Sequence, residues 1–547
     1  MKIGKVSATE KSPTTNDEFI FWLDDKIEIK PFDIVQAENN VGDKNSTTYA
    51  IIQDISHITD SSGHIGSYVS SDFGDLGAEP MTKRLGVTYA NAKVVHNTKD
   101  VYMPLRDGTV VEFADEAGVK EALGLKNIKN KIPAGFLDVS NNITVPIYFN
   151  SDFLIGPEGA HLNISGISGL ATKTSYAMFL LQAIQQTKND VAIIIFNVKG
   201  NDLLRLDENN PLLTEAQKAE WSKTDLECKP FTNTRYFYPF RENKENFYCN
   251  TSCEKETLGR QFSDNIAHTY VYTYNHARDT NILDLLFSNI DDPSFTMESI
   301  LNVIAESKDF EDLDWTSFKE KLSENTKKGQ NRGQEITVQS WRKFTRLIKK
   351  SIINPMFQKA WSTDPDKHNC HLSEEIKKIK KGEVLVVDIA KLEEQLQGFV
   401  FGDVLQAITE LKFGETERSE EDIPKKIIIF VDELNKYASG NTPKNSPVLK
   451  NLLDITERGR SEGTILFSAE QFKSDIHDRV QGNCSTHVYG RTNDIEISKP
   501  SYKYLQPTFK NMMTRLDKGE LIVQHSIFKT LLKIKFPYPS YYQREGE

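Results

Sequence analysis

Six short runs rich in apolar residues, all after residue 160, constrain the fold of this chain most strongly. They are Leu162–Ile167, Val191–Val198, Val384–Ile389, Ile427–Val431, Thr464–Ser468 and Thr486–Tyr489. A strand that is apolar along its whole length is buried on both faces, as in a parallel sheet covered by helices. Thr174–Gln186 follows the first run and carries apolar residues at helical spacing. The runs therefore predict an α/β core.

A long insertion interrupts this core. Roughly 180 residues separate the second run from the third, which is far too many for a loop in a compact domain. The stretch Ser294–Lys359 has a helical pattern, so we expect a helical insertion at 207–382 within a core formed by 153–206 and 383–499. Two more short strands, Leu521–Gln524 and Leu531–Lys535, are expected in a C-terminal segment, 500–547.

The N-terminal part has a different pattern. Short runs of alternating apolar and polar residues are separated by Gly, Asn, Asp and Ser, which predicts a small β-barrel or sandwich over 1–152. The clearest runs are Met1–Ala8, Glu18–Leu23, Thr48–Ile58 and Val87–Val95. Residues 1–150 contain 15 Lys and Arg against 21 Asp and Glu, a local charge of −6. This acidity favours contact with protein over contact with DNA.

Composition narrows the class of protein further. The 547 residues carry a net charge of −11, which excludes a basic nucleic-acid coat but not a local basic surface. No apolar run approaches the roughly 18–20 residues that span a bilayer, and the first 25 residues lack a secretory pattern. Five cysteines fit a reducing compartment better than a disulfide scaffold. We expect a cytoplasmic protein without membrane segments.

The first candidate motif joins the first apolar run to the helix after it. A phosphate-binding loop needs inward backbone N–H groups, a helix N-terminus, a Lys for the phosphates and a Ser or Thr for Mg²⁺. The candidate residues are Gly166, Gly169, Thr172, Lys173, Thr174 and Ser175. The usual pattern G-x-x-x-x-G-K-[ST] is imperfect, because Thr172 stands where a glycine is expected before the lysine. A glycine-rich turn that binds nothing is the alternative.

The second motif is an acidic pair after an apolar strand. Asp432 and Glu433 follow Ile427–Val431, which places both carboxylates at the sheet edge where open α/β sheets bind ligands. Asp432 would hold Mg²⁺, and Glu433 would orient the attacking water. Asp388 ends a competing strand but lacks the adjacent Glu, so Asp432 is preferred. The alternative is an ordinary solvated turn.

A third group of polar residues lies around the fifth run. Gln471 follows this strand and is placed to sense a γ-phosphate. Arg458 and Arg460 end the preceding helix, from which an arginine could reach the nucleotide of a neighbouring subunit. A favourable interaction with the helix dipole is the alternative for both arginines.

Two weaker signals favour ordinary structural explanations. Thr326–Lys350 contains eight Lys and Arg with Trp341 and Phe344 among them, which suits nucleic-acid contact, but a solvated basic helix face is preferred. The cysteines, with His368 and His371, are spaced too irregularly for a zinc site. We therefore predict that the cysteines are small buried thiols.

In order along the chain, these motifs resemble the HerA branch of the HerA/FtsK translocase ATPases. The resemblance rests on Lys173-Thr174, Asn197 running into Lys199-Gly200, Asp432-Glu433, Glu457-Arg458-Gly459-Arg460, Ser468-Ala469-Glu470-Gln471, Asn483–Val488 and Lys518–Leu521. It is strong from Asp432 to Arg491 and weak in the insertion. Asn197 stands where the family often has Asp.

The resemblance implies a RecA-like core, an N-terminal barrel and a homo-hexameric ring that moves double-stranded DNA using ATP and Mg²⁺. By position, Lys173 and Thr174 would bind phosphate and Mg²⁺, Asp432 and Glu433 would serve the metal and the water, Gln471 would be the sensor, and Arg458 or Arg460 would act in trans. A partner nuclease or other effector would dock near the barrel, and the C-terminal segment would brace the ring. The altered loop favours a member of an anti-phage system.

Two other functions remain open. The altered phosphate loop suits a ring scaffold that binds nucleotide and organises a partner enzyme with little motor activity. A secretion- or conjugation-type ATPase of the same superfamily is a further alternative, although the absence of an apolar span argues against a membrane-anchored version.

Overall fold

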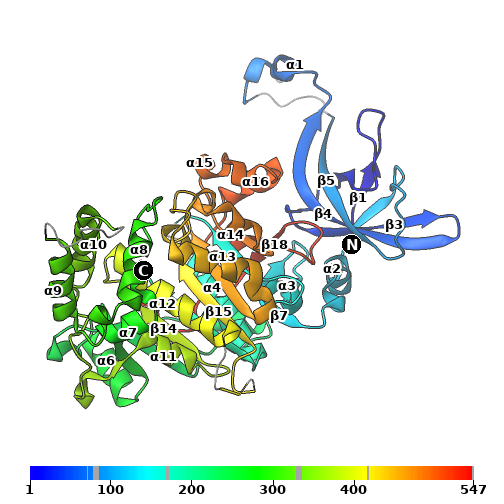
Figure 1. Ribbon diagram of the computed structural model, residues 1–547. Coiled ribbons are helices and arrows are strands. Elements are labelled where there is room, and N and C mark those ends of the chain that lie inside the picture. Colours follow the sequence, from blue (N-terminus) through cyan, green and yellow to red (C-terminus); the bar gives the residue numbers. More distant parts are fainter. Residues whose placement is uncertain are drawn as a thin grey trace.

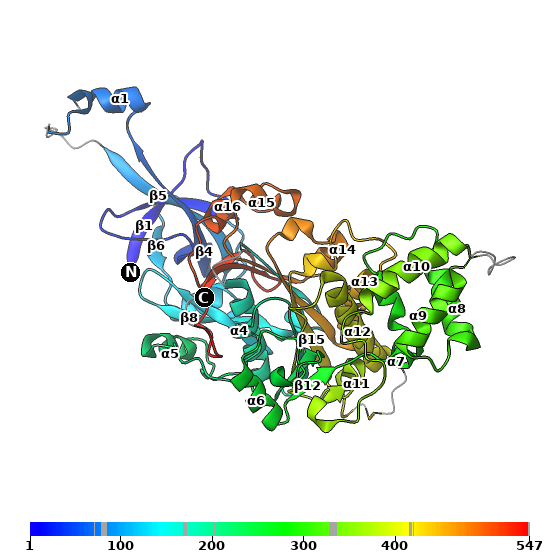
Figure 2. The ribbon, with the colours of Figure 1, turned by 90° about the vertical axis from the view of Figure 1, so that its left-hand side faces the viewer.

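The computed structural model describes residues 1–70, 72–77, 85–167, 172–201, 203–327, 336–414, 418–419 and 421–544. A closed N-terminal barrel is followed by a large sheet covered by helices (Figure 1). In Figure 2, the barrel and the helices α8, α9 and α10 lie at opposite ends of the molecule. Among the described residues, no helix combines the length and the apolar character needed to cross a membrane.

The barrel is closed by six strands in the order β1-β2-β5-β4-β3-β6. These are β1 (Lys2–Ser7), β2 (Glu18–Leu23), β3 (Ile34–Val41), β4 (Lys44–Thr59), β5 (Gly86–Asn97) and β6 (Val110–Phe113). Alternate residues such as Val6, Phe21 and Val111 are buried inside the barrel. The alternating runs therefore form a barrel and not a sandwich, and closure leaves no unpaired sheet edge.

Strands β4 and β5 continue beyond the barrel as a two-stranded ribbon that carries α1 (His64–Val69) at its end (Figure 1). Helix α1 buries none of its residues. The exposed apolar residues here, which we call the arm tip, are Ile58, Ile65, Tyr68, Val69, Phe73, Leu76 and Leu85. An exposed apolar cluster of this kind is typical of an interaction surface.

The large sheet has the order β13-β12-β11-β14-β10-β15-β16-β9-β17-β18-β19-β7-β8 among the described strands. Its strands run parallel from β13 to β17 and antiparallel from β17 to β8. The central strands are β9 (Leu162–Ser165), β10 (Val191–Asn197), β14 (Val384–Asp388), β15 (Lys426–Asp432), β16 (Thr464–Glu470) and β17 (Thr486–Tyr489). All six predicted apolar runs thus lie side by side in one sheet.

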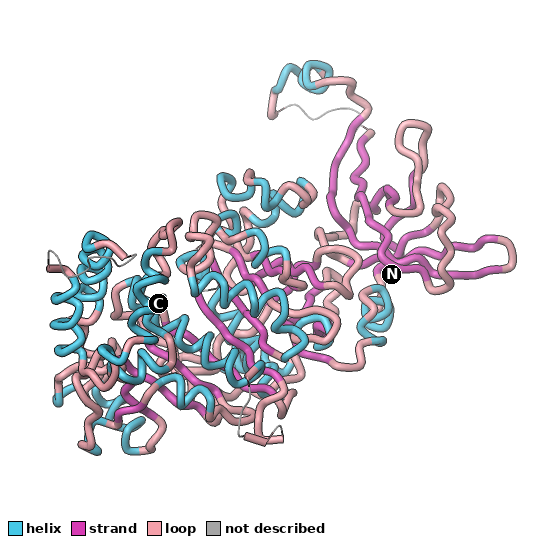
Figure 3. Tube along the Cα trace, in the orientation of Figure 1, coloured by secondary structure: helices cyan, strands magenta, loops and turns pink. Residues whose placement is uncertain are grey.

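Helices cover both faces of this sheet, as the tube in Figure 3 shows. On one face, α4 (Thr172–Thr187) packs Leu180 and other apolar residues against alternate residues of the strands. On the other face lie α12 (Glu394–Phe413) and α13 (Pro447–Glu462). Phe401 of α12 meets Phe196 of β10 with ring centroids 4.9 Å apart. Two covered faces explain why the strands are apolar throughout.

The insertion is helical, as predicted, but it also supplies three strands. Strands β11 (Thr234–Pro239), β12 (Ala267–Tyr270) and β13 (Asn369–Cys370) extend the sheet beyond β14. Its α-helices are α5 (Glu215–Ser222), α6 (Lys255–Ser263), α7 (Tyr274–Asp279), α8 (Thr296–Glu306), α9 (Trp315–Asn325), α10 (Val338–Ser351) and α11 (Leu372–Lys377). The three strands are short, and β11 and β12 contain tyrosine in place of aliphatic residues, so they lack the aliphatic pattern of the other strands.

The sheet also receives strands from both sides of the core in sequence. Strands β7 (Lys131–Asp138) and β8 (Thr144–Asn150) lie within the segment expected to form the N-terminal β-module, but they pair with the sheet and not with the barrel. The predicted C-terminal strands are β18 (Glu520–His525) and β19 (Leu532–Lys535), which connect β17 to β7. The remaining helices are α2 (Glu116–Ala122), α3 (Ser151–Leu154), α14 (Asp478–Gly482), α15 (Asp494–Ile497) and α16 (Pro507–Met513).

The buried ring of His161 predicts that acid destabilises the fold. Its Nδ1 accepts the N–H of Leu466 at 3.0 Å, and burial lowers its pKa to about 4. Between pH 6.5 and 4 the unfolded chain binds a proton that the folded chain does not, so stability falls as the pH falls through this range. The loss between pH 7 and pH 5 is about 2 kcal/mol for this group.

We expect the urea midpoint to be lower at pH 5 than at pH 7, and His161→Gln to reduce that difference, whatever its effect at pH 7. A variant whose midpoint shifts with pH as much as that of the wild type would contradict this assignment.

Candidate active site

The candidate site lies at the edge of the sheet where five parallel strands end. Strand β9 pairs with β16 and β17, and β15 pairs with β16 and β10, all in parallel register. The carboxyl ends of parallel strands meet at one edge, where ligands bind in open α/β sheets. The residues that follow β9, β10, β15, β16 and β17 are therefore neighbours in space although they are far apart in sequence.

The strand end before the predicted phosphate loop is held on both sides. The N–H of Gly166 donates to the carbonyl of Glu470 at 3.1 Å, and that of Ile167 donates to the carbonyl of Arg491 at 2.7 Å. A Cβ at Gly166 would lie 3.1 Å from that Arg491 carbonyl, which is a tight contact, so this position favours glycine. Gly169, another candidate residue, lies outside the described residues.

Lys173 lies in the first turn of α4 and is only 5% exposed. Its ammonium donates to the carbonyl of Gly166 at 2.7 Å. Burial lowers the pKa of Lys173, while the nearby carboxylates of Asp432 and Glu470 oppose this shift. A buried cation beside a helix N-terminus is suited to contact phosphate oxygens.

The hydroxyl of Thr174 donates to Asp432 Oδ2 at 3.1 Å, which joins the first turn of α4 to the end of β15. Asp432 is 2% exposed. A hydroxyl and a carboxylate are the hard oxygen ligands that Mg²⁺ prefers, so these two residues fit a magnesium site. Asp388, the competing residue, instead accepts hydrogen bonds from Asn197, at 2.8 Å, and Thr251.

Glu433 follows Asp432 with a left-handed backbone, φ 58°, which turns the chain out of the sheet. Burial alone would raise the pKa of Glu433, but ammonium groups of Lys436 and Lys199 outweigh burial and lower it. Lys436 lies 2.6 Å from Oε2. Glu433 is therefore a charged acceptor at the sheet edge, as a group that orients water must be.

Lys199 belongs to the site, although it was not among the predicted site residues. It follows β10, and its ammonium lies 2.9 Å from Asp432 Oδ2 and 3.4 Å from Glu433 Oε1. Burial disfavours its charge, but the two carboxylates outweigh burial and raise its pKa. This cation neutralises part of the acidic pair. The sequence signal for Lys199 is its position, because it lies two residues after a buried strand that ends at the same edge of the sheet.

Glu470, the last residue of β16, is a second residue that the sequence analysis did not select. It is completely buried, and its Oε1 accepts a hydrogen bond from Ser468 at 3.3 Å. Burial, reinforced by the charge of Asp432, raises the pKa of Glu470 well above its ordinary value. The predicted sensor, Gln471, comes directly after this strand and is partly exposed. Both residues lie at the edge where the parallel strands end.

Arg458 and Arg460 lie at the opposite edge of the sheet. Helix α13 ends at Glu462, and the carbonyl of Gly463 accepts the N–H of Ile427 near the start of β15. Arg460 donates to the carbonyl of Glu158, just before β9 begins. Both arginines are exposed. They lie near the starts of the parallel strands, whereas Lys173 of the same chain lies near their carboxyl ends. Within one chain the structure does not bring them to the site.

The two weaker sequence signals do not reach this site. Trp341 and Phe344 of α10 are buried within the insertion, so neither ring is presented for stacking on bases. The cysteines are free thiols, four of them buried and Cys228 partly exposed. Among the described residues, no group of three or more His, Cys, Asp and Glu is placed to hold a metal ion.

Comparison with known proteins gives only distant likenesses. No family model and no curated protein matches the chain. Among solved structures, it is similar to the bacterial conjugative coupling protein TrwBdeltaN70, with a TM-score of 0.43 and 11% identity over 76% of this chain and 92% of that one. It is also similar to VirB4 of Thermoanaerobacter pseudethanolicus, with a TM-score of 0.42 and 14% identity over 75% of this chain and 96% of that one.

The genome packaging NTPase B204 from Sulfolobus turreted icosahedral virus 2, in complex with ATP-gammaS, gives a TM-score of 0.23 and 15% identity over 31% of this chain and 72% of that one. All these TM-scores are below 0.5, so the likenesses assign no activity to this chain. The predicted fold class, an α/β core with an N-terminal barrel and an inserted helical segment, is confirmed by the architecture itself.

The contact between Thr174 and Asp432 predicts a magnesium-dependent gain in stability. We expect ADP with Mg²⁺ to raise the melting temperature of the wild type more than ADP alone, because the bound metal adds to the binding free energy. Asp432→Asn should abolish this extra increment. Asp388→Asn is the matched control, which should keep the increment even if its baseline melting temperature falls. Loss of the increment in the Asp388 variant alone would reverse the assignment.

Proposed function

We propose that this protein is a Mg²⁺-dependent ATP hydrolase that drives movement of double-stranded DNA. The observation that carries the proposal is the convergence of Lys173, the Thr174–Asp432 pair and Glu433 at the carboxyl edge of one parallel sheet. Phosphoryl transfer to water needs a cation for the phosphates, a metal site and a group that orients the nucleophile. The site contains one candidate for each role.

Each residue has a defined task in this proposal. Lys173 and the N-terminus of α4 bind the β- and γ-phosphates, and Thr174 with Asp432 holds the metal. When bound, Mg²⁺ would supply charge stabilisation to the phosphate oxygens. Glu433 accepts a hydrogen bond from the attacking water and aligns it, while Gln471 follows the neighbouring strand and senses the γ-phosphate.

A homo-hexameric ring is part of the proposal because of Arg458 and Arg460. Their place at the far edge of the sheet supports a role only at a nucleotide bound by a neighbouring subunit. An arginine supplied in this way stabilises charge in the transition state. The C-terminal segment would brace such a ring. A monomeric particle both with and without ATP would contradict the arrangement.

We further propose a partner nuclease or other effector that docks at the barrel side of the ring. The exposed apolar residues of the arm tip support a protein contact there. The exposed face of α10, with Arg342, Lys343, Arg346 and Lys350, offers a surface for DNA phosphates. A cytoplasmic anti-phage setting rests on the family resemblance alone.

A nucleotide-binding scaffold with little motor activity is the second candidate. It is favoured by Lys199, whose ammonium is paired with the same Asp432 that the metal needs, and by Thr172 in the place of a glycine. Turnover of about 1 s⁻¹ or faster, the ordinary lower range of enzymes, would exclude a purely structural role.

Two substitutions test the hydrolase. Glu433→Ala should lower DNA-stimulated ATP turnover by about 10²-fold or more, since the water loses its orienting group, while nucleotide binding remains. Lys173→Ala should weaken nucleotide binding by at least tenfold, because a charge-assisted contact to phosphate is lost. Lys188→Ala, just beyond the other end of α4, is the matched control. Unchanged turnover in either site variant would contradict the proposal.

The basic face of α10 gives a separate prediction. Replacing Arg342 and Arg346 together by alanine should leave basal ATP turnover intact and reduce its stimulation by DNA severalfold, since phosphate contacts supply non-specific affinity. The stimulation should also become less sensitive to salt. If stimulation and its salt dependence match the wild type, α10 is only a solvated helix face.

A further inference from the structure

We propose that a cavity between the first turn of α4 and the C-terminal tail binds the nucleoside part of the ATP molecule. This inference rests on the hydrolase proposed above and deepens it. The cavity has a volume of about 290 Å³ and is formed by Phe136, Thr172, Ser175, Gln217, Glu220, Lys518, Gly519, Lys535, Phe536, Pro537, Tyr538, Pro539 and Gln543. We call it the tail pocket.

The first turn of α4 separates the two halves of the proposed ligand. Thr174 points to Asp432, as their hydrogen bond shows. Thr172 and Ser175, three residues apart and so on one face of the helix, line the tail pocket instead. Phosphates bound at this helix N-terminus would thus have the metal site on one side and the tail pocket on the other. A nucleotide has the same order of parts: metal, phosphates, nucleoside.

The size of the tail pocket fits one nucleoside and not a whole triphosphate. Sites for drug-sized ligands occupy about 300–1,000 Å³, so this cavity is at the lower limit. The phosphates would have to lie outside it. Their binding place at Lys173 is adjacent, because Thr172 directly precedes that residue and Ser175 follows it two positions later.

The lining chemistry suits a flat heterocycle with polar edges. Tyr538 and the neighbouring prolines present apolar surface, and the ammonium of Lys518 lies 5.4 Å from the centroid of the Tyr538 ring. Stacking on an aromatic ring is a general way to bind a nucleobase. The Oε1 of Gln217 already accepts from Thr214 in the capping box of α5, so Gln217 can only donate to the base edge. Gln543 can accept at the base edge, and Glu220 can accept from hydroxyl or amino groups.

The tail that forms this wall is anchored, which makes the tail pocket a preformed site. The indole N–H of Trp221 donates to the Tyr538 carbonyl at 2.9 Å, and Asn210 donates to the Pro539 carbonyl at 2.8 Å. Gln182 of α4 donates to the hydroxyl of Ser540 at 2.8 Å. The wall is therefore tied to the helix that carries Lys173, so the two parts of the proposed site have a fixed relation.

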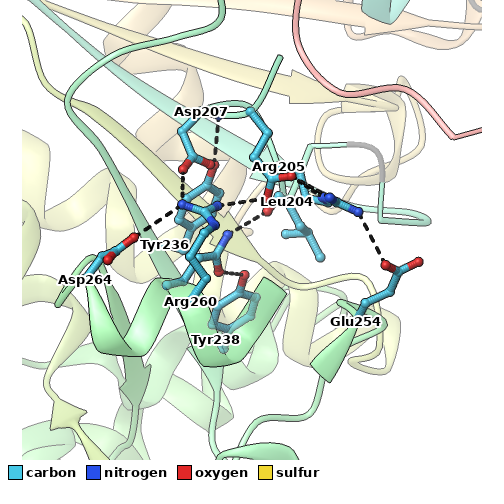
Figure 4. A network of polar contacts seen from close by, with 10 residues as sticks. Leu204, Arg205, Asp207, Tyr236, Tyr238, Glu254, Arg260 and Asp264 are labelled. Atoms are coloured by element: carbon cyan, nitrogen blue, oxygen red, sulfur yellow. Dashed lines mark hydrogen bonds and ion pairs between the residues drawn. The ribbon is translucent and has the colours of Figure 1, made fainter. Parts of the chain in front are cut away.

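A network of charged residues holds the tail from its far end. Figure 4 shows Arg205 near Glu254, and Arg260 near Asp207 and Asp264, with Asp207 beside the Tyr236 hydroxyl. The guanidinium of Arg205 also stacks on Tyr542, 3.4 Å from the ring centroid. The N–H of Tyr542 donates to the carbonyl of Glu208 at 2.8 Å. The network thus fixes the end of the tail to the segment that follows β10.

The test compares the full-length wild type with Tyr538→Ala, using calorimetric titration with Mg²⁺ present and two probes, ADP and inorganic tripolyphosphate. Tyr538→Ala should lower the affinity for ADP by about tenfold or more and leave the affinity for tripolyphosphate unchanged, because only ADP has a base to stack. Lys173→Ala should weaken the binding of both probes. Tyr538→Phe should bind ADP nearly as well as the wild type, and Tyr102→Ala, an exposed tyrosine on the barrel, is the matched control.

Unchanged ADP affinity in Tyr538→Ala would overturn the tail pocket as the nucleoside site. An equal loss for both probes in Tyr538→Ala would also overturn it, since the tyrosine would then act only through the fold. Failure of the wild type to bind either probe would instead contradict the proposed hydrolase. The two failures are therefore distinguishable.

Discussion

The parallel pairing of β9, β16 and β15 sets the position of the candidate site within the sheet. Asp432 lies opposite Ala469, and Glu470 lies opposite Ser165, so three strand ends far apart in sequence come together at one edge. A shift of register by one residue would reverse the face of every side chain on the shifted strand. The apolar cores on both faces of the sheet resist such a shift, and the site is therefore positioned by the same burial that stabilises the fold.

The site concentrates charge in a place that excludes most water. Lys173 and Asp432 are nearly inaccessible. Buried charges are costly unless they are paired, and here Lys199 balances the acidic pair of Asp432 and Glu433. In the proposed hydrolase, the same low exposure strengthens every contact with phosphate and metal. The arrangement links stability and function, because removing one charge leaves another without its partner.

Much of the architecture was predictable because burial leaves a direct pattern in the sequence. The six apolar runs and the helix after β9 lie where they were expected, and Asp432 stands beside Thr174 at the expected edge. The strands of the insertion were missed because Tyr-rich stretches as short as β11 and β12 have no distinct aliphatic period. Strands β7 and β8 were expected with the barrel, since the pairing of β7 with β19, near the other end of the chain, leaves no local trace in the sequence.

The site was less predictable than the fold. The one signal for Lys199 was its place after a buried strand, and the register of β10 beside β15 is what brings it to Asp432. Glu470 was overlooked because a carboxylate at the end of a strand usually faces solvent, and its burial depends on β9 and β17 beside it. The tail pocket depends on contacts between residues 172–175 and the last residues of the chain, which no local motif records.

An experimental structure of the full chain with Mg²⁺ and a non-hydrolysable ATP analogue would test the proposed nucleotide site most directly. We expect phosphates beside Lys173, the metal between the Thr174 hydroxyl and Asp432, and the base against Tyr538. An analogue bound at any other place, or a metal held by Asp388 in place of Asp432, would contradict this proposal.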